Sequence, residues 1–361
     1  MAKITQFSLQ NFRNFDQAWL KLAPGLNLIV GDNAAGKTSL IEGIWVLATG
    51  RSFRTVKPSQ LIQQTHADLT LFAEVEQDGQ THKLGLNRTE HSSTLRLNGE
   101  TIHSQALLAN KLPVQLLTPE SHRLLEEGPK ARRQFLDWGC FHQYPTFSQA
   151  WRHYQRILKQ RNHALRQKLP KAQTTLWDAQ LLETAEQVHQ IRQAYTEQLK
   201  PYLDEFCQAM MPELQLDIQL GYKSGWPKNA ASLAQLLQDH YAKDAQQGFT
   251  QYGCHRADLS FKLDGQDALV KLSRGQQKLF VCALLLAQAS VYEKHSNAPV
   301  IMLIDDLPAE LDAQHRLTLL KLLDCLNIQH IISTTAEELV SVLNPKTTQI
   351  FQVKHGQIIS D

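Results

Sequence analysis

The chain lacks long apolar runs and any cysteine pattern, and these two absences exclude several classes of protein. None of its apolar runs reaches the ~18 residues that a membrane span needs, and residues 1–15 lack the apolar core of a secretion signal. Its five cysteines are scattered, without a C-x-x-C pair, which argues against a zinc ribbon or a disulfide framework. We therefore expect an unexported, cytoplasmic protein without membrane contact.

The chain also has little net charge and no low-complexity segment. Its formal charge is +2, so the overall charge does not indicate a partner. Hydrophobic residues make up 42% and charged residues 20%, a balance that excludes a disordered chain. A length of 361 residues suits about two domains, yet neither an internal repeat nor a long Gly/Ser linker separates them.

Hydrophobic periodicity predicts α/β structure at both ends of the chain. Short apolar runs at 26–30, 299–304 and 329–333 are typical of buried parallel strands. Residues 69–102 alternate between apolar and polar in short runs, which predicts a meander of hairpins. Residues 276–292 predict a strongly apolar helix.

The middle of the chain has a different character. Residues 120–204 are rich in long side chains and largely helical in pattern, and their last amphipathic helix is expected to end near Pro201. The fold class is therefore predicted as an α/β head split between residues 1–119 and 205–361, with 120–204 inserted as a mainly helical arm.

Residues 31–38 carry the first chemical motif. Their sequence, GDNAAGKT, fits G-x-x-x-x-G-K-[ST], with a predicted buried strand before it and a helix after it. In such a loop backbone N–H groups surround phosphate, Lys37 neutralises the β/γ oxygens, and the Thr38 hydroxyl is placed to hold Mg²⁺. The predicted ATP-binding residues are Gly31, Asp32, Asn33, Ala34, Ala35, Gly36, Lys37 and Thr38.

Two acidic residues follow the predicted strand at 299–304. Buried carboxylates are costly unless they meet a cation or act on a proton. Asp305 is therefore predicted to be the second anchor for Mg²⁺, and Asp306 to polarise the attacking water. The alternative is that the pair caps the next helix, since Pro308 suits the start of one.

A third motif precedes the apolar helix at 276–292. Residues 271–278, KLSRGQQK, are similar to the L-S-G-G-Q signature of ABC-type ATPases, in which amides at a helix N-terminus bind the γ-phosphate held by the opposite subunit. The plainer alternative is that Ser273 only caps the helix. The candidate signature residues are Ser273, Arg274, Gly275 and Gln276.

The order of these motifs resembles the RecF family of bacterial recombination-repair ATPases, which is related to SMC heads. The resemblance covers essentially the whole chain. It is carried by NFRNF at 11–15, TGRSFR at 49–54, GPKARRQFLD at 128–137 and LIDDLPAELDAQH at 303–315. Three residues depart from the family's usual pattern, namely Ala34 and Glu127 in place of glycine and Cys254 in place of proline.

The resemblance implies an ABC/SMC-type P-loop head with weak DNA-dependent ATPase activity, which uses ATP and Mg²⁺ as a switch. Thr334 stands where related ATPases have a switch histidine, and Gln115 is a further candidate ligand of Mg²⁺ beside Thr38 and Asp305. The residues implied in catalysis are Lys37, Asp306, Thr334 and Ser273. If the signature acts in trans, two chains must face each other, so we expect a homodimer that forms only with ATP.

The resemblance also implies partners. These are double-stranded DNA and single-strand/double-strand junctions, RecR, and through it RecO and the loading of RecA, with roles in gap repair, replication maintenance and SOS induction. The stretch between Trp138 and Trp177 has seven Lys/Arg and no acid, which suits phosphate contacts or merely a solvated helix face. The candidate DNA contacts are Arg152, Arg156, Lys159 and Arg161, together with Arg51, Arg54 and Lys57.

Three alternatives stay open at this point. The ATPase subunit of a membrane transporter would carry a switch histidine and lack the basic insertion. An SMC-like head needs a long coiled coil, for which the insertion at 120–204 is too short. Binding of ATP without turnover would leave Asp306 with a structural role.

Overall fold

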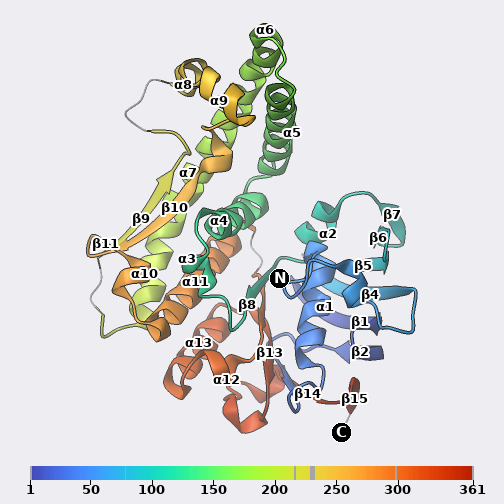
Figure 1. The fold of residues 1–361 in the computed structure, drawn as a ribbon. Coiled ribbons are helices and arrows are strands. Elements are labelled where there is room, and N and C mark those ends of the chain that lie inside the picture. The colour runs from blue at the N-terminus through green and yellow to red at the C-terminus, as the bar shows by residue number, and fades with distance from the viewer. Residues whose placement is uncertain (1, 78, 215–216, 228–231, 297–298, 360–361) are drawn as a thin grey trace. The chain divides into compact units, whose positions relative to one another are not determined.

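The computed structural model describes the chain except for residues 1, 78, 215–216, 228–231, 297–298 and 360–361. The chain divides into two compact units (Figure 1). Unit 1 comprises Met1–Ser121, Ala209–Met211 and Lys278–Asp361, and unit 2 comprises His122–Gln208 and Pro212–Gln277.

This division differs from the predicted one after the insertion. The sequence assigns residues 212–277 to the head, whereas the structure groups them with the helical insertion. The reason is tertiary packing, because β9 (Ile218–Lys223) pairs with β10 (Asp258–Leu263), and β10 packs against α4 (Pro129–Gln143). The alternation of apolar residues at 214–220 predicts a strand that begins before β9, and residues 215–216 of it lie outside the described residues.

One sheet of unit 1 is an antiparallel meander, as predicted. Its strand order is β2-β1-β4-β5-β6-β7, and its buried side chains alternate along β4, for instance Leu69, Leu71 and Ala73. The strands are β1 (Lys3–Phe12), β2 (Phe15–Lys21), β4 (Asp68–Gln77), β5 (Gln80–Thr89), β6 (Ser93–Leu97) and β7 (Glu100–Ile102).

The other sheet of unit 1 is mainly parallel and holds the predicted buried strands. Its order is β15-β14-β3-β13-β12-β8, in which only β15 runs antiparallel to its neighbour. The strands are β3 (Leu26–Val30), β8 (Val114–Leu117), β12 (Ile301–Ile304), β13 (Gln329–Thr334), β14 (Gln349–Lys354) and β15 (Gln357–Ile359). Every residue of β3, β12 and β13 is buried, which suits the wholly apolar β12 and the apolar residues that make up most of β3.

Helix α1 (Lys37–Thr49) packs against strands of both sheets. Its Leu40, Ile41 and Ile44 belong to one core cluster with side chains of the meander and of the parallel sheet. The other helices of unit 1 are η1 (Pro58–Leu61), α2 (Gln105–Lys111), α12 (Leu307–Glu310), α13 (Ala313–Cys325), η4 (Glu337–Leu339) and η5 (Pro345–Thr347), while α11 (Arg274–Ser296) begins in unit 2 and continues into unit 1. The carboxyl ends of β3 and β12 thereby bring the loop at 31–38 and the acids at 305–306 to one edge of this sheet, at the start of α1.

Unit 2 is mainly helical, with a three-stranded sheet of order β11-β10-β9. Its elements besides α4, β9 and β10 are α3 (Arg123–Glu126), α5 (Phe147–Arg166), α6 (Lys171–Thr174), η2 (Thr175–Trp177), α7 (Asp178–Met210), α8 (Leu233–Asp239), α9 (Tyr241–Gln247), η3 (Cys254–Arg256), β11 (Gln266–Asp267) and α10 (Ala268–Lys271). None of the described helices of the chain is both long and apolar enough to cross a bilayer.

The prediction that the long helix ends near Pro201 is wrong. Helix α7 continues through this proline to Met210. A proline inside a helix costs ~3 kcal/mol, because it removes one hydrogen bond and crowds the preceding turn. The apolar stripe nevertheless continues past it with the buried Leu203, Phe206 and Met210. Burial of each such side chain contributes about 1.5–3 kcal/mol, so together they outweigh the proline.

Candidate active site

The loop at 31–38 joins β3 to α1 and has the backbone geometry of an anion site. A Cβ on Gly31 would lie 2.3 Å from the carbonyl oxygen of Val353, and Gly36 has φ +121°, so both positions require glycine. Helix α1 begins at Lys37, and its first backbone hydrogen bonds run from the Ser39 and Leu40 N–H groups to the Gly36 carbonyl, so the N–H groups of Lys37 and Thr38 precede the helical ladder. The loop therefore presents N–H groups and a helix N-terminus to a phosphate.

Lys37 folds back over this loop. Its Nζ donates to the carbonyl oxygens of Gly31 at 2.6 Å and Asp32 at 2.9 Å, and the side chain is largely buried. Burial lowers the pKa of Lys37, whereas the negative charges of Asp306, Asp305 and Asp32 act in the opposite direction. The ammonium group thus lies within the loop that is predicted to bind phosphate.

Asp305 and Thr38 form the donor set expected for Mg²⁺. The Thr38 hydroxyl donates to Asp305 Oδ1 at 2.9 Å, across the gap between the start of α1 and the end of β12. Burial raises the pKa of Asp305, and hydrogen bonds from Ser333 and Thr38 act in the opposite direction. The described residues hold no cluster of three His, Cys, Asp or Glu side chains suited to a metal. One carboxylate and one hydroxyl fit Mg²⁺, which takes its other ligands from phosphates and water.

Ser333 is a site residue that the sequence analysis missed. Its hydroxyl donates to Asp305 Oδ1 at 2.7 Å and accepts from the backbone N–H of Asp306 at 2.8 Å. Asp306 has φ +54°, a left-handed conformation that this hydrogen bond helps to hold. Ser333 is in reach because β12 and β13 are adjacent, with Ile304 opposite Ile332. Both strands are predictable, but their adjacency is not.

Thr334 ends β13 directly beside the loop at 31–38. Its carbonyl oxygen accepts from the Gly31 N–H at 3.3 Å, and its hydroxyl donates to the Ala336 carbonyl at 2.9 Å. The structure therefore brings Thr334 to the predicted edge, with its hydroxyl engaged in a local turn.

The structure contradicts the predicted role of Gln115 as a Mg²⁺ ligand. Gln115 is buried and pairs in register with Met302, three residues before Asp305 on the neighbouring strand. At about 3.3 Å per residue this places it roughly 10 Å from the edge that carries the acids. Its Nε2 instead donates to Oε1 of Gln288 in α11 at 3.1 Å.

The signature segment forms the exposed N-terminus of α11. The Gln276 N–H donates to the Ser273 hydroxyl at 3.4 Å, and the Ser273 N–H donates to Gln276 Oε1 at 3.0 Å, which is a capping box. Ser273, Arg274 and Gly275 are exposed. The helix cap is therefore confirmed, whereas the binding of a γ-phosphate from the opposite subunit stays a prediction.

Comparison with known proteins assigns the chain to a family. It matches the RecF/RecN/SMC N-terminal domain family over residues 3–359. The DNA replication and repair protein RecF of Hydrogenovibrio crunogenus is 62% identical to it over 99% of each chain. The protein of the same name from Shewanella loihica is 40% identical over 98% of each chain. The chain belongs to the RecF family.

A solved structure of the RecF family has the same fold. It is the recombination mediator protein RecF with ATP, in the RecFOR pathway, with a TM-score of 0.88 and 25% identity over 99% of this chain and 97% of that one. The predicted ABC/SMC-type head is thereby confirmed, and so is the resemblance to RecF drawn from the motifs. The transporter-type alternative is wrong.

In this RecF-family chain the buried Glu42 of α1 pairs with two arginines, Arg13 before the helix and Arg54 after it. The Glu42 carboxylate accepts from Arg13 Nε at 2.8 Å and Nη2 at 2.6 Å, and Arg54 Nη1 lies 3.5 Å away. The Ser52 hydroxyl donates to the same carboxylate. Arg54 is therefore ion-paired although it is exposed, and Arg51 and Lys57 are exposed too.

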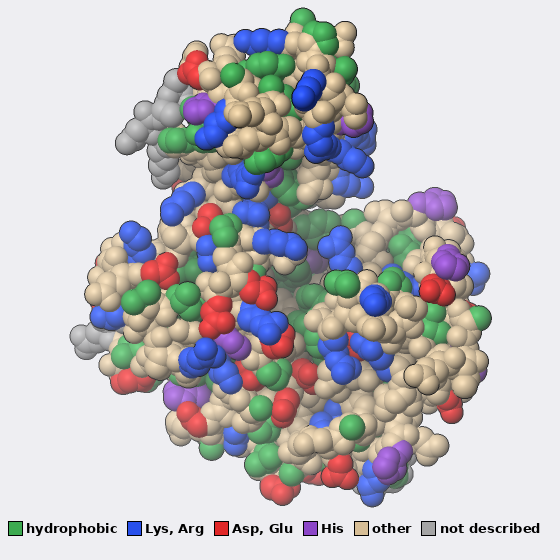
Figure 2. All heavy atoms as spheres, in the orientation of Figure 1, with side chains coloured by type: hydrophobic (Ala, Val, Ile, Leu, Met, Phe, Trp, Pro, Cys, Tyr) green, Lys and Arg blue, Asp and Glu red, His purple; other side chains and the backbone are tan. Residues whose placement is uncertain are grey.

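Helix α5 presents three of its four candidate DNA contacts to solvent. Arg152, Arg156 and Lys159 are exposed at a spacing of four and three residues, and therefore share one helix face. Figure 2 shows Lys and Arg side chains gathered on the part of unit 2 that contains α5. They form an open basic stripe.

Arg161 is a correction to this group, because it is fully buried. Its Nε lies 2.8 Å from Asp178 Oδ1, and its Nη1 lies 2.8 Å from both Asp244 Oδ2 and the Thr250 hydroxyl. Its position falls on the buried stripe of α5 with Tyr154. The helical spacing of Arg161 from Tyr154 could have indicated that Arg161 is buried. The lack of acidic residues in the stretch suggested a DNA contact instead.

The three departures from the family pattern have different local settings. Ala34 has φ +65°, a left-handed conformation that costs a non-glycine residue about 1–2 kcal/mol. Glu127 ends α3 and lies 3.8 Å from Arg123. Cys254 is buried, its thiol donates to the Ala185 carbonyl at 3.0 Å, and burial raises its pKa to about 12. Only Ala34 lies in the nucleotide loop.

Proposed function

We propose that this chain is an ATP-driven dimer clamp of recombinational gap repair, which holds DNA at single-strand/double-strand junctions. Slow, DNA-dependent ATP hydrolysis then times its release. Together with RecR and RecO it promotes the loading of RecA, and it contributes to replication maintenance and SOS induction. The names of its relatives support this proposal, as does the solved relative described as a recombination mediator with ATP in the RecFOR pathway.

The residues at the sheet edge have separate roles in binding the nucleotide, the cation and the attacking water. ATP with Mg²⁺ supplies the phosphate charge that bridges two copies and the bond whose cleavage separates them. Lys37 and the amides of the loop bind phosphate oxygens, and Thr38 and Asp305 bind the cation. Asp306 holds the attacking water, with its backbone fixed by Ser333.

The observation that carries the clamp is the exposed amino end of α11. Ser273 caps the Gln276 amide, and the positive end of the helix dipole lies at the exposed Ser273, Arg274 and Gly275. A γ-phosphate on a second copy is the anion that this segment is suited to bind. Two-fold symmetry would form two such contacts at once, so ATP and dimerisation are linked.

The basic stripe of α5 supports binding to DNA without sequence readout. Arg152, Arg156 and Lys159 have long exposed side chains on one helix face. Contacts of this kind go to phosphates, and their affinity falls steeply with salt. Arg51, Arg54 and Lys57 in unit 1 are further candidates because they are exposed. Arg161 is left out of the proposal.

The test is the mass of the protein in solution without nucleotide, with ATP and Mg²⁺, and with ADP. We expect a dimer only with ATP. Lys37→Met should lose nucleotide binding, whereas Ser273→Arg should bind ATP as a monomer, because its own P-loop is intact. Ser59→Arg places the same side chain at an exposed position outside both motifs and should dimerise normally. A mass that ATP leaves unchanged, while nucleotide binds, would exclude the clamp.

A further inference from the structure

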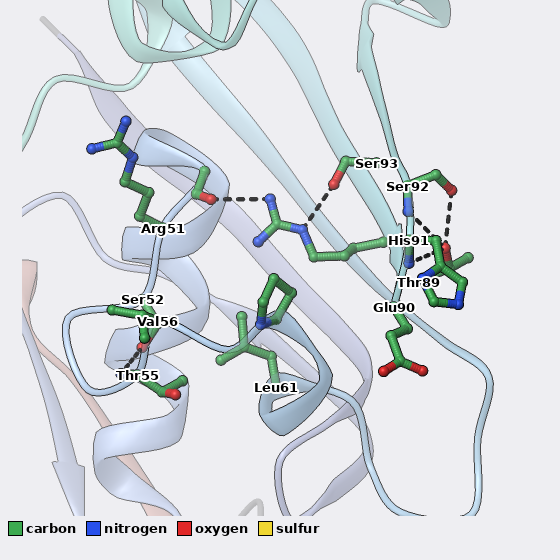
Figure 3. Close-up of a pocket in the computed structure, with 13 residues that line it drawn as sticks. Arg51, Ser52, Thr55, Val56, Leu61, Thr89, Glu90, His91, Ser92 and Ser93 are labelled. Carbon is green, nitrogen blue, oxygen red and sulfur yellow. Dashed lines mark hydrogen bonds between the residues drawn. The ribbon is translucent and has the colours of Figure 1, made fainter. Parts of the chain in front are cut away.

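Unit 1 contains a pocket of about 520 Å³ that residues 31–38 do not line. One wall is the segment after α1, with Ser52, Thr55 and Leu61, and the other is the turn between β5 and β6, with Ser92 and Ser93 (Figure 3). A volume of this size suits a small organic ligand and far exceeds a bare phosphate ion.

Arg88 is the residue that defines the chemistry of the pocket. Its Nη2 donates to the Gly50 carbonyl at 3.0 Å and its Nε to the Ser93 hydroxyl at 2.9 Å. Among the described residues no carboxylate lies within ion-pair distance of this half-buried guanidinium, and burial lowers its pKa. A desolvated cation without a counter-ion is costly, so an anion in the pocket would stabilise it.

The remaining lining is suited to a phosphate that carries an organic group. Ser52, Thr55 and Ser92 line the open space, and their hydroxyls are already bonded to Glu42, Gln60 and Thr89. The buried Leu61 and the exposed Val56 form the apolar part of the lining. Glu90 is the acid in this lining, and no ion pair within the described chain joins it to Arg88. Two hydroxyl-bearing walls and an apolar patch match a sugar phosphate better than a simple oxyanion.

We propose that this pocket binds one phosphorylated nucleotide unit, with the phosphate on Arg88 and the sugar against Val56 and Leu61. The unit has two possible sources, a residue of a DNA strand and a free nucleotide. The first source rests on the proposed function, whereas the pocket itself does not.

The direct test uses thymidine 3′,5′-bisphosphate as the probe, titrated calorimetrically into protein whose P-loop is saturated with ADP. We expect binding to the wild-type protein and a loss of about tenfold or more in Arg88→Gln, because a charge-assisted contact is removed. Arg96→Gln is the matched control, since it removes an exposed arginine from the same hairpin outside the pocket. Val56→Asp adds a negative charge at a position that is 96% exposed, and it should weaken the probe without affecting folding.

A second measurement separates the two sources. If Arg88→Gln also weakens binding of a labelled DNA duplex and lowers the salt slope by about one, the source is a DNA strand. If duplex binding is unchanged while probe binding is lost, the source is a free nucleotide. A wild-type protein that does not bind the probe, or an equal loss in Arg96→Gln, would overturn the proposal. Dimerisation of Arg88→Gln with ATP tests the clamp separately.

Discussion

Replacing Arg161 separates a structural arginine from the DNA-facing arginines of the same helix. Arg161 joins three parts of unit 2, because it contacts Asp178 at the start of α7, Asp244 in α9 and the Thr250 hydroxyl. In Arg161→Met the aliphatic bulk remains but the charge is lost. Asp244, 1% exposed, would then be buried without its cation.

The expected cost follows from that uncompensated charge. Removing one partner of a buried ion pair typically destabilises a protein by about 3–5 kcal/mol. Burial already raises the pKa of Asp244, and Arg161 opposes that rise, so the variant should raise it further. The variant destabilises the ionised form of the Asp244 carboxylate. Relative to the wild type, the loss of stability should therefore be complete above the further raised pKa of Asp244 in the variant. It should shrink as the pH falls from there to the lower pKa of Asp244 in the wild-type protein.

Calorimetry of the variants measures this effect. We expect Arg161→Met to lower the melting temperature of the transition that includes unit 2 by roughly 10 °C at neutral pH. The control Arg156→Met, exposed on the same helix, should change stability by less than about 0.5 kcal/mol while weakening DNA binding. A fully stable Arg161→Met protein with reduced DNA affinity would refute the reasoning, because it would make Arg161 a surface contact.

Three further predictions concern other sites. Ser333→Ala should slow ATP turnover about tenfold, because Asp305 loses a hydrogen-bond donor, whereas Ser333→Thr should retain turnover. Steady-state hydrolysis measured at several Mg²⁺ concentrations checks this. Equal rates in both variants would contradict it. Burial lowers the pKa of His255 to about 4, and the folded state holds its ring neutral beside Tyr154. The free energy of unfolding should therefore fall as the pH drops below about 6.5, by about 3 kcal/mol at pH 4. Urea unfolding should show a shallower loss in His255→Gln. Ala34→Gly should raise the stability by about 1 kcal/mol by removing the left-handed strain, as read from thermal unfolding, and an unchanged or lower melting temperature would show that the strain is negligible.

The chemistry-bearing segments were predictable because each is contiguous in the chain. Local sequence determines the structure of each segment. Glycines form the turn at 31–38, the apolar β12 ends at the acids, and a Ser–Gln capping box starts α11. The family followed from the order of these segments. The buried strands were equally accessible, because apolar runs without alternation are typical of a covered parallel sheet.

Residues whose role depends on a neighbour far away in the chain were not predictable in this way. Ser333 is a site residue only because β13 lies beside β12, and Gln115 is excluded from the cation only by its register opposite Met302. Helix α7 passes Pro201 because packing of its later turns outweighs a local penalty.

By itself the sequence determined that this chain has a nucleotide loop, a pair of strand-end acids and a capped signature helix, since local motifs carry their chemistry with them. Only the tertiary structure decided which groups surround those motifs. It buries Arg161 between two carboxylates and ties Arg54 to Glu42. It also leaves Arg88 in a pocket without a counter-ion among the described residues. The physical reason is that periodicity shows which face of an element is buried, but desolvation and charge pairing depend on what packs against that face.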